Sequence, residues 1–197
     1  MVDHGDAYPR SVVLNKENGS AYREVDLFKI PGSTGANCTG VSIGGFEVSS
    51  ANYLVAINSI DHSLVKNYTS FEMQGLSIDQ RDIIICTVPR DELDQLEVRQ
   101  ITLAKYVGSS KIASIPQLVK ISEDNFMVLW QEFDKKSNKP GAVKYVFVDG
   151  NGEAASEVRS VAYFRLSSCQ PMVLEDAVMW YTNENNLRYF YTIPLDA

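Results

Sequence analysis

The chain of 197 residues carries a net charge of −7, with 25 Asp and Glu residues against 18 Lys and Arg residues. Because such a chain lacks the basic stripe that phosphate contacts need, no nucleic-acid binding is expected. No apolar run reaches the length of about 18 residues that a membrane helix requires, so no membrane span is expected. The opening MVDHGDAYPR is neither basic nor apolar and predicts no signal peptide.

The three cysteines, Cys38, Cys86 and Cys169, are far apart and odd in number. That pattern is neither a disulfide framework nor a CxxC metal pair. Cys86 lies in the apolar run IIIC, where we expect a small buried side chain. The sequence predicts no cofactor and no metal.

The first predicted element is a hairpin over residues 9–30, with an Asn18-Gly19 turn of the kind that hairpins favour. A loop rich in turn-forming residues follows it at 31–39. The next predicted strands cover about residues 42–49, 53–60, 82–88 and 98–106, with an insertion at 62–81. The segment 89–100 is the best helical candidate, and it is equally compatible with a charged connection.

Two further groups of strands follow along the chain. The first covers about residues 116–122, 125–133, 142–149 and 158–165, and the second covers about 171–174, 177–182 and 187–193. No segment shows the apolar period and caps of a helix of three turns.

The strand groups are copies of one another. Ser42–Asp61 lies over Ile115–Asp134 without a gap, at a spacing of 73 residues, and a shorter copy covers Pro171–Asn183. Each copy is an apolar strand, a tight polar turn and a second apolar strand, which indicates a repeat architecture. With the strands of one unit counted first to fourth, the chain reads third and fourth, two full sets, then first to third, thirteen strands in all.

Four-stranded units of this type resemble the blades of β-propellers. The segment DHGDAYPR, the hairpin of the first two strands and the DGNGE turn are similar to uncharacterised propeller repeats of bacterial secreted or surface proteins. The resemblance implies an all-β partial β-propeller of consecutive four-stranded antiparallel blades, about three of them. It implies the second half of a blade at 1–39, blades at 40–108 and 109–167, and an incomplete blade at 168–197. A pair of β-sandwiches is the alternative fold.

Thirteen strands with both ends inside a blade do not close a ring comfortably. We therefore expect either a fragment of a larger propeller or copies that assemble, and exposed blade edges favour self-association. A truncated fragment would be secreted or at the cell surface, and the chain would otherwise be cytoplasmic.

Three local patterns resemble catalytic or ligand-binding motifs, but a structural interpretation is favoured for each. Gly40–Gly44 matches G-x-S-x-G, but a strand rather than a helix follows its serine, so a nucleophile is not expected. Asp149–Glu153 has alternating oxygen donors, and we expect a hairpin turn there rather than a calcium loop. Trp130 and Trp180 occupy matching second strands, where packing between blades is favoured over a sugar platform.

The candidate binding residues follow from the blade pattern. The loops that leave second strands share one face of a propeller with the connections between blades. The residues expected to rim that face are His4, Asp6, Arg10, Asp61, His62 and Asp134, with Asp3 and Glu184 beside them. The competing interpretation is that Asp residues at strand ends cap turns.

Two functions remain open from the sequence. The first is a non-enzymatic binding or scaffold module with a protein or glycan ligand on the loop face. The alternative is part of a propeller enzyme, a carbohydrate-active hydrolase or lyase that uses the Asp and His rim. An enzyme needs two or three of these side chains to converge on one substrate atom.

Overall fold

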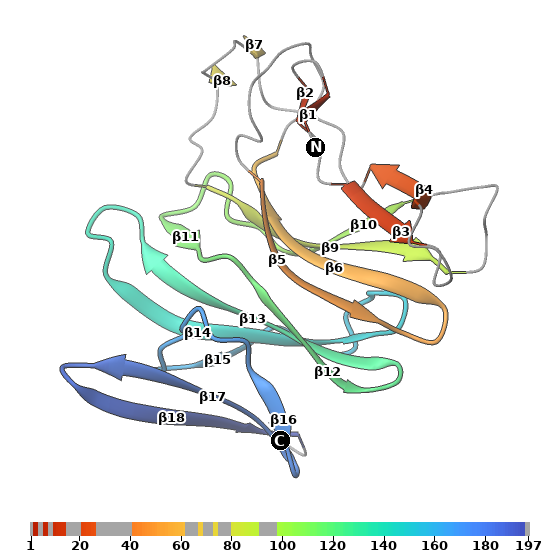
Figure 1. Cartoon of the computed structure of the whole chain (residues 1–197). Coiled ribbons are helices and arrows are strands. Elements are labelled where there is room, and N and C mark those ends of the chain that lie inside the picture. The colour runs from red at the N-terminus through yellow and green to blue at the C-terminus, as the bar shows by residue number, and fades with distance from the viewer. Residues whose placement is uncertain are drawn as a thin grey trace.

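The computed structural model describes residues 2–3, 6–7, 10–14, 21–26, 41–61, 67–68, 73–74, 80–90 and 98–195. For the described residues before 41, and for 67–68 and 73–74, only the backbone is described. The described part is all-β, and three antiparallel sheets are stacked from top to bottom in Figure 1. Within it, no helix has the length and apolar character needed to span a membrane.

The first sheet contains four strands, which pair in chain order. They are β5 (Val41–Val48), β6 (Asn52–Ser59), β9 (Asp82–Pro89) and β10 (Arg99–Ala104). The central strands β6 and β9 are buried on both faces, and continuous apolar runs, YLVAI and IIIC, form their interiors. Short strands β7 (Asn67–Tyr68) and β8 (Met73–Gln74) pair within the predicted insertion.

The second sheet has the same order of strands. They are β12 (Gln117–Ser122), β13 (Asn125–Asp134), β14 (Pro140–Asp149) and β15 (Arg159–Val161), and β11 (Lys111–Ala113) pairs with the end of β13. The strand predicted at 158–165 ends early. Tyr163 has a φ of 66°, which is outside the extended region.

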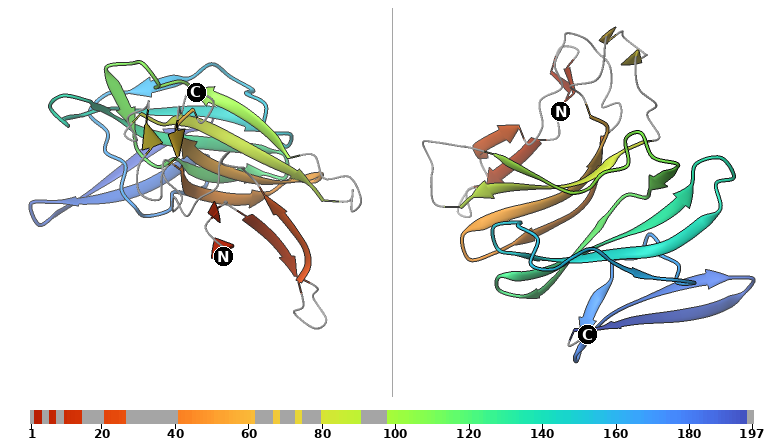
Figure 2. Two further views of the ribbon diagram at one scale, coloured as in Figure 1. Left: turned by 90° about the horizontal axis from the view of Figure 1, so that it is seen from above. Right: turned by 180° about the vertical axis from the view of Figure 1, so that it is seen from behind.

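The third sheet consists of β16 (Met172–Leu174), β17 (Ala177–Glu184) and β18 (Leu187–Pro194). Near the N-terminus, β1 (Val2–Asp3) pairs with β2 (Asp6–Ala7), and β3 (Arg10–Leu14) pairs with β4 (Ala21–Asp26). Figures 1 and 2 show the β3–β4 hairpin on the side of the first sheet that faces away from the second.

The main strand groups have the order that the repeat predicted. In chain order, the β3–β4 hairpin precedes sheets β5-β6-β9-β10, β12-β13-β14-β15 and β16-β17-β18. Each sheet is one contiguous stretch of chain, with consecutive main strands as neighbours. The described residues form no closed ring, so the structure establishes an all-β stack of sheets at this level of detail.

Apolar layers join the sheets. Leu54, Ile83 and Ile85 of the first sheet pack against Phe126 and Trp130 of the second. In the next layer, Met127, Leu129 and Tyr145 pack against Val178, Trp180 and Ile193. Each interior is thus a face-to-face packing of two sheets.

Both tryptophans belong to these layers. Trp130 is fully buried, and its Nε1 donates to the Tyr106 hydroxyl at 2.6 Å. Trp180 is 3 % exposed and donates to the Arg165 carbonyl at 2.6 Å. The prediction of packing between blades is therefore confirmed as packing between sheets. Cys86 is also fully buried, as predicted, and burial raises the pKa of its thiol to about 12.

The first strands of the three sheets are neighbours, because β12 lies beside both β5 and β16. A glycine at the centre of β5 permits this approach. A Cβ on Gly44 would lie 1.7 Å from the Pro116 carbonyl oxygen, and the pairing register of β5 shifts between Ile43 and Gly45. Here the strand needs glycine because another backbone occupies the space of a side chain.

Candidate functional site

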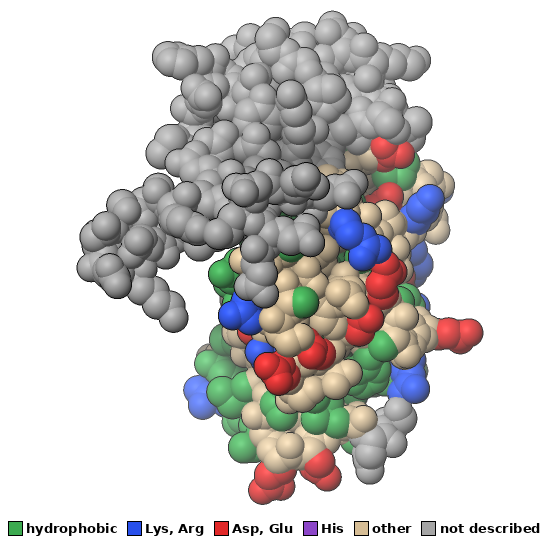
Figure 3. Space-filling view, turned by 90° about the vertical axis from the view of Figure 1, so that its right-hand side faces the viewer, with side chains coloured by type: hydrophobic (Ala, Val, Ile, Leu, Met, Phe, Trp, Pro, Cys, Tyr) green, Lys and Arg blue, Asp and Glu red, His purple; other side chains and the backbone are tan. Residues whose placement is uncertain are grey.

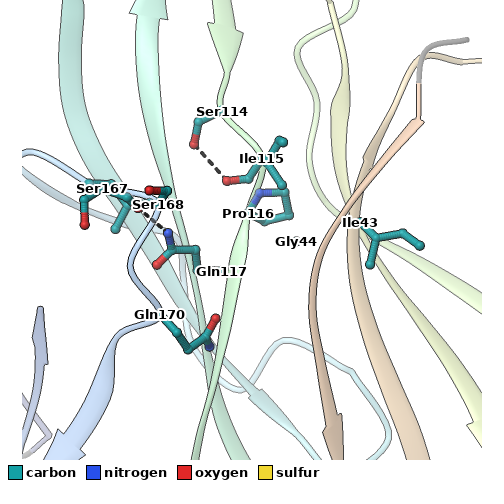
Figure 4. A pocket seen from close by; sticks show the side chains of 10 residues that line it. Ile43, Gly44, Ser114, Ile115, Pro116, Gln117, Ser167, Ser168 and Gln170 are labelled. Carbon is teal, nitrogen blue, oxygen red and sulfur yellow. Dashed lines mark hydrogen bonds between the residues drawn. The ribbon is translucent and has the colours of Figure 1, made fainter.

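A cavity of about 430 Å³ lies at the N-terminal ends of these neighbouring strands. Its wall comes from Ile43 and Gly44 of β5, from the segment Ser114–Gln117 that leads into β12, and from residues 166–168 with Gln170 before β16. Figure 4 shows Ser114–Gln117 between β5 on one side and the 167–170 segment on the other. The connections between sheets therefore supply most of the lining.

Buried amide side chains hold these connections in place. Asn58 of β6 donates from Nδ2 to the Ser114 carbonyl at 3.1 Å. Gln131 of β13 accepts from the Leu166 N–H at 2.9 Å and donates to the Gly141 carbonyl at 2.7 Å. Asn58 and Gln131 are 73 residues apart, at the same place in the repeat. The first and second sheets thus each use a second-strand amide to fix the segment that enters the next sheet.

Two further amides join the connecting segments to each other. Gln117 donates from Nε2 to the Ser167 carbonyl, and Gln170 donates from Nε2 to the Leu118 carbonyl at 2.5 Å. Both bonds link β12 to the segment before β16. They also fix the orientation of each carboxamide, because a nitrogen that faces a carbonyl oxygen must be the donor.

The oxygen of Gln117 has no partner among the described residues. Gln117 is 8 % exposed, and its Oε1 is a buried atom that accepts no hydrogen bond from any of them. Within the described part of the chain, two other buried side-chain oxygens share this condition, Asn58 Oδ1 and Thr182 Oγ1, but neither residue is among the described lining residues of the cavity. A buried acceptor without a donor costs on the order of 1–3 kcal/mol, which a suitable ligand could recover.

The described lining residues carry no ionisable side chain. They supply serine hydroxyls, two carboxamides and the aliphatic side chains of Ile43, Ile115, Pro116 and Leu166. Ile43 and Ile115 are 55 % and 49 % exposed. The arrangement can hold an uncharged group by hydrogen bonds and apolar contacts, but it offers no acid, base or thiolate.

The structure does not describe the side chains of four of the six residues predicted to rim the loop face. His4 and His62 are outside the described residues. Asp6 and Arg10 lie in β2 and β3, whose side chains are likewise outside the description. The expected convergence of imidazole and carboxylate groups therefore stays a prediction.

Asp61 and Asp134 are described, and both follow or end a second strand as predicted. The Asp134 carboxylate accepts from the Ser137 N–H and hydroxyl, both at 2.8 Å, and these bonds hold its pKa below the ordinary value. Asp134 therefore caps its own turn, as the plainer interpretation proposed. Asp61 is half-buried, and neither residue lines the cavity.

The remaining motifs are structural. Ser42 of the G-x-S-x-G match lies within β5, and its hydroxyl accepts from Arg81 Nη1 at 2.6 Å. In the DGNGE turn, the Asp149 carboxylate accepts from the N–H groups of Asn151 and Glu153. No cluster of three or more His, Cys, Asp or Glu residues suited to a metal occurs within the described ranges.

Comparisons with known proteins add no relative. No protein-family model, no curated protein and no solved structure matches the chain at a significant level.

Proposed function

We propose that the chain is a non-enzymatic binding module of β-propeller type, and that it binds its ligand in the cavity between the first strands. The observation that carries this proposal is the lining itself. It combines exposed aliphatic side chains with a buried Gln117 oxygen that has no donor. Concave sites with a few fixed polar groups in an apolar wall are typical of ligand pockets.

The sheet order supports the propeller part of the proposal. Each sheet is contiguous in sequence, its strands pair in chain order, and its first strand lies beside the first strand of the next sheet. Propeller blades arranged around an axis have this order. A pair of β-sandwiches would instead connect strands between facing sheets by Greek-key crossings.

The enzyme alternative receives less support. A hydrolase or lyase needs a general acid or base within hydrogen-bond reach of the substrate. The described lining residues include no such group, and the Asp134 carboxylate is bound to Ser137 of its own turn. A binding module with a protein or glycan ligand therefore fits the described residues better.

A selection experiment tests the proposal. A displayed library of random short peptides and an array of neutral oligosaccharides are each probed with the wild-type chain and with Ser168→Trp. Ser168 is an exposed lining residue, so the indole fills the cavity without disturbing the core. Ser122→Trp, at the exposed far end of β12, is the matched control. Binding should be lost only in Ser168→Trp, and ligands that bind all three forms equally would refute the proposal.

We also propose self-association through the third sheet. Strand β18 is the outer strand of that sheet, and Leu187 and Phe190 on it are 59 % and 62 % exposed. Figure 3 shows hydrophobic side chains in the lower part of the molecule, at the level of this sheet. Two copies can pair β18 with β18 in antiparallel fashion about a two-fold axis. The molecular mass in solution should rise with protein concentration, and at a given concentration it should be lower for Phe190→Lys than for the wild type.

A further inference from the structure

We infer that the ligand is an uncharged, extended peptide segment that donates a main-chain N–H to Gln117 Oε1 and places an aliphatic side chain in the cavity. This inference rests on the proposed function, because it concerns the same cavity. It goes further by naming the atom that selects the ligand and the class of ligand that satisfies it.

The first step is the requirement for a donor. Gln117 Nε2 donates to the Ser167 carbonyl, so the carboxamide cannot turn over without placing two oxygens together. Its Oε1 therefore stays an acceptor. Because the side chain is only 8 % exposed, bulk water compensates this acceptor poorly, and a ligand donor gains more there than at an exposed site.

The second step concerns access. Gln117 and Gln170 are neighbours in Figure 4, and the side chain of Gln170 is exposed. Since Oε1 is shielded, a donor reaches it only when a neighbouring side chain moves, and we infer that the exposed Gln170 side chain is the one that moves. The hydrogen bond from Gln170 to the Leu118 carbonyl opposes that displacement.

The third step decides between a peptide and a glycan. None of the described lining residues is aromatic, so they offer no stacking surface to a sugar ring. The wall instead offers Ile43, Ile115 and Leu166 to an apolar side chain. An extended peptide presents main-chain donors and side chains at alternating positions, which matches one buried acceptor beside an aliphatic wall.

The composition of the described lining favours a peptide segment without charged side chains. Among the residues that the structure describes, none in the lining is ionisable and could pair with a ligand charge. A charged side chain would lose its hydration in the cavity without a partner to compensate it.

The test is a double-mutant cycle with a peptide selected from the displayed library. Each main-chain N–H of the peptide is methylated in turn, and Gln117→Met is made as the matched change in the protein. We expect one methylated position to weaken binding to the wild-type chain about tenfold, the effect of losing one hydrogen bond to a buried acceptor. The same methylation should have no effect on binding to Gln117→Met.

The outcomes separate this inference from the proposed function. Oligosaccharides that bind and are blocked by Ser168→Trp, with no peptide bound, would overturn the peptide assignment and leave the binding module standing. Peptide binding that is blocked by Ser168→Trp but shows no coupling to Gln117 would overturn the donor assignment. Binding of neither library would overturn both. The methylation series on the wild-type chain needs no variant, so it decides the matter even if Gln117→Met folds poorly.

Discussion

The two ends of the first and second sheets are joined in different ways. At the turn end, Ser50 donates its N–H and hydroxyl to the Asp124 carboxylate at 2.9 and 2.8 Å, and Asn52 donates to the Gly150 carbonyl at 2.9 Å. At the cavity end, amides hold the connections, yet Gln117 Oε1 and Asn58 Oδ1 have no donor among the described residues.

The difference favours a role beyond folding for one of the two ends. The hairpins β5–β6 and β12–β13 reach both ends, yet among the described residues of these two sheets only the cavity end has buried side-chain acceptors without a donor. Proteins generally satisfy their buried polar groups, and exceptions concentrate at functional sites. In line with the proposed function, we propose that the turn end joins the sheets and that the cavity end binds the ligand.

The largest stability effect is expected from Gln131→Leu at the cavity end. Gln131 is only 2 % exposed. The substitution removes the acceptor of the Leu166 N–H and the donor to the Gly141 carbonyl. Unfolding in urea should show that the free energy of unfolding falls by about 2–3 kcal/mol. Gln170→Leu, which removes one bond from an exposed amide, is the matched control and should cost less than about 1 kcal/mol. If both variants lost the same free energy of unfolding, the greater burial of Gln131 would not explain its contribution to stability.

A smaller effect is expected from Asn52→Ala at the turn end. Asn52 donates to the Gly150 carbonyl and to Asn151 Oδ1, but Gly150 keeps a second donor, the Ser49 hydroxyl at 2.9 Å. We expect a loss of about 1 kcal/mol in urea unfolding. Peptide binding should be unchanged, since the substitution lies at the other end of the sheets. Weakened binding would show that the two ends are not independent.

The smallest effect is a dependence on pH at the turn end. Hydrogen bonds from Ser50 hold the pKa of Asp124 below its ordinary value. The stabilisation is therefore complete above the ordinary carboxyl pKa and is lost as the pH falls through the lowered value in the folded state. Thermal melts in that acidic range should show a shallower decline for Asp124→Asn than for the wild type. An unchanged slope would contradict the role of Asp124.

The repeat in the sequence predicted the strand order well, because apolar strands separated by polar turns are a local signal. The spacing of 73 residues paired Asn52–Val55 with Asn125–Val128, and these segments begin β6 and β13. The predicted length of β15 was wrong. The strand ends before Tyr163, whose positive φ is a feature of tertiary structure and not of composition.

The cavity was missed because its lining is made of connections. Ser114–Pro116 and Leu166–Ser168 carry only small, apolar or neutral residues, and no motif distinguishes them from ordinary loops. One signal was available. Asn58 and Gln131 are amides at the same repeat position inside apolar strands, and a buried amide requires partners that only the neighbouring connection could supply. Asp134 was predicted as a binding residue instead, although Ser137 lies close enough in the sequence to donate to its carboxylate.

The most direct measurement is the affinity of the strongest selected peptide for three forms of the chain, determined by titration calorimetry. Wild type and Ser122→Trp should bind the peptide equally, and Ser168→Trp should bind it at least about tenfold more weakly, a difference of about 1.4 kcal/mol. Equal affinity for Ser168→Trp and the wild type would contradict the assignment of the cavity as the binding site.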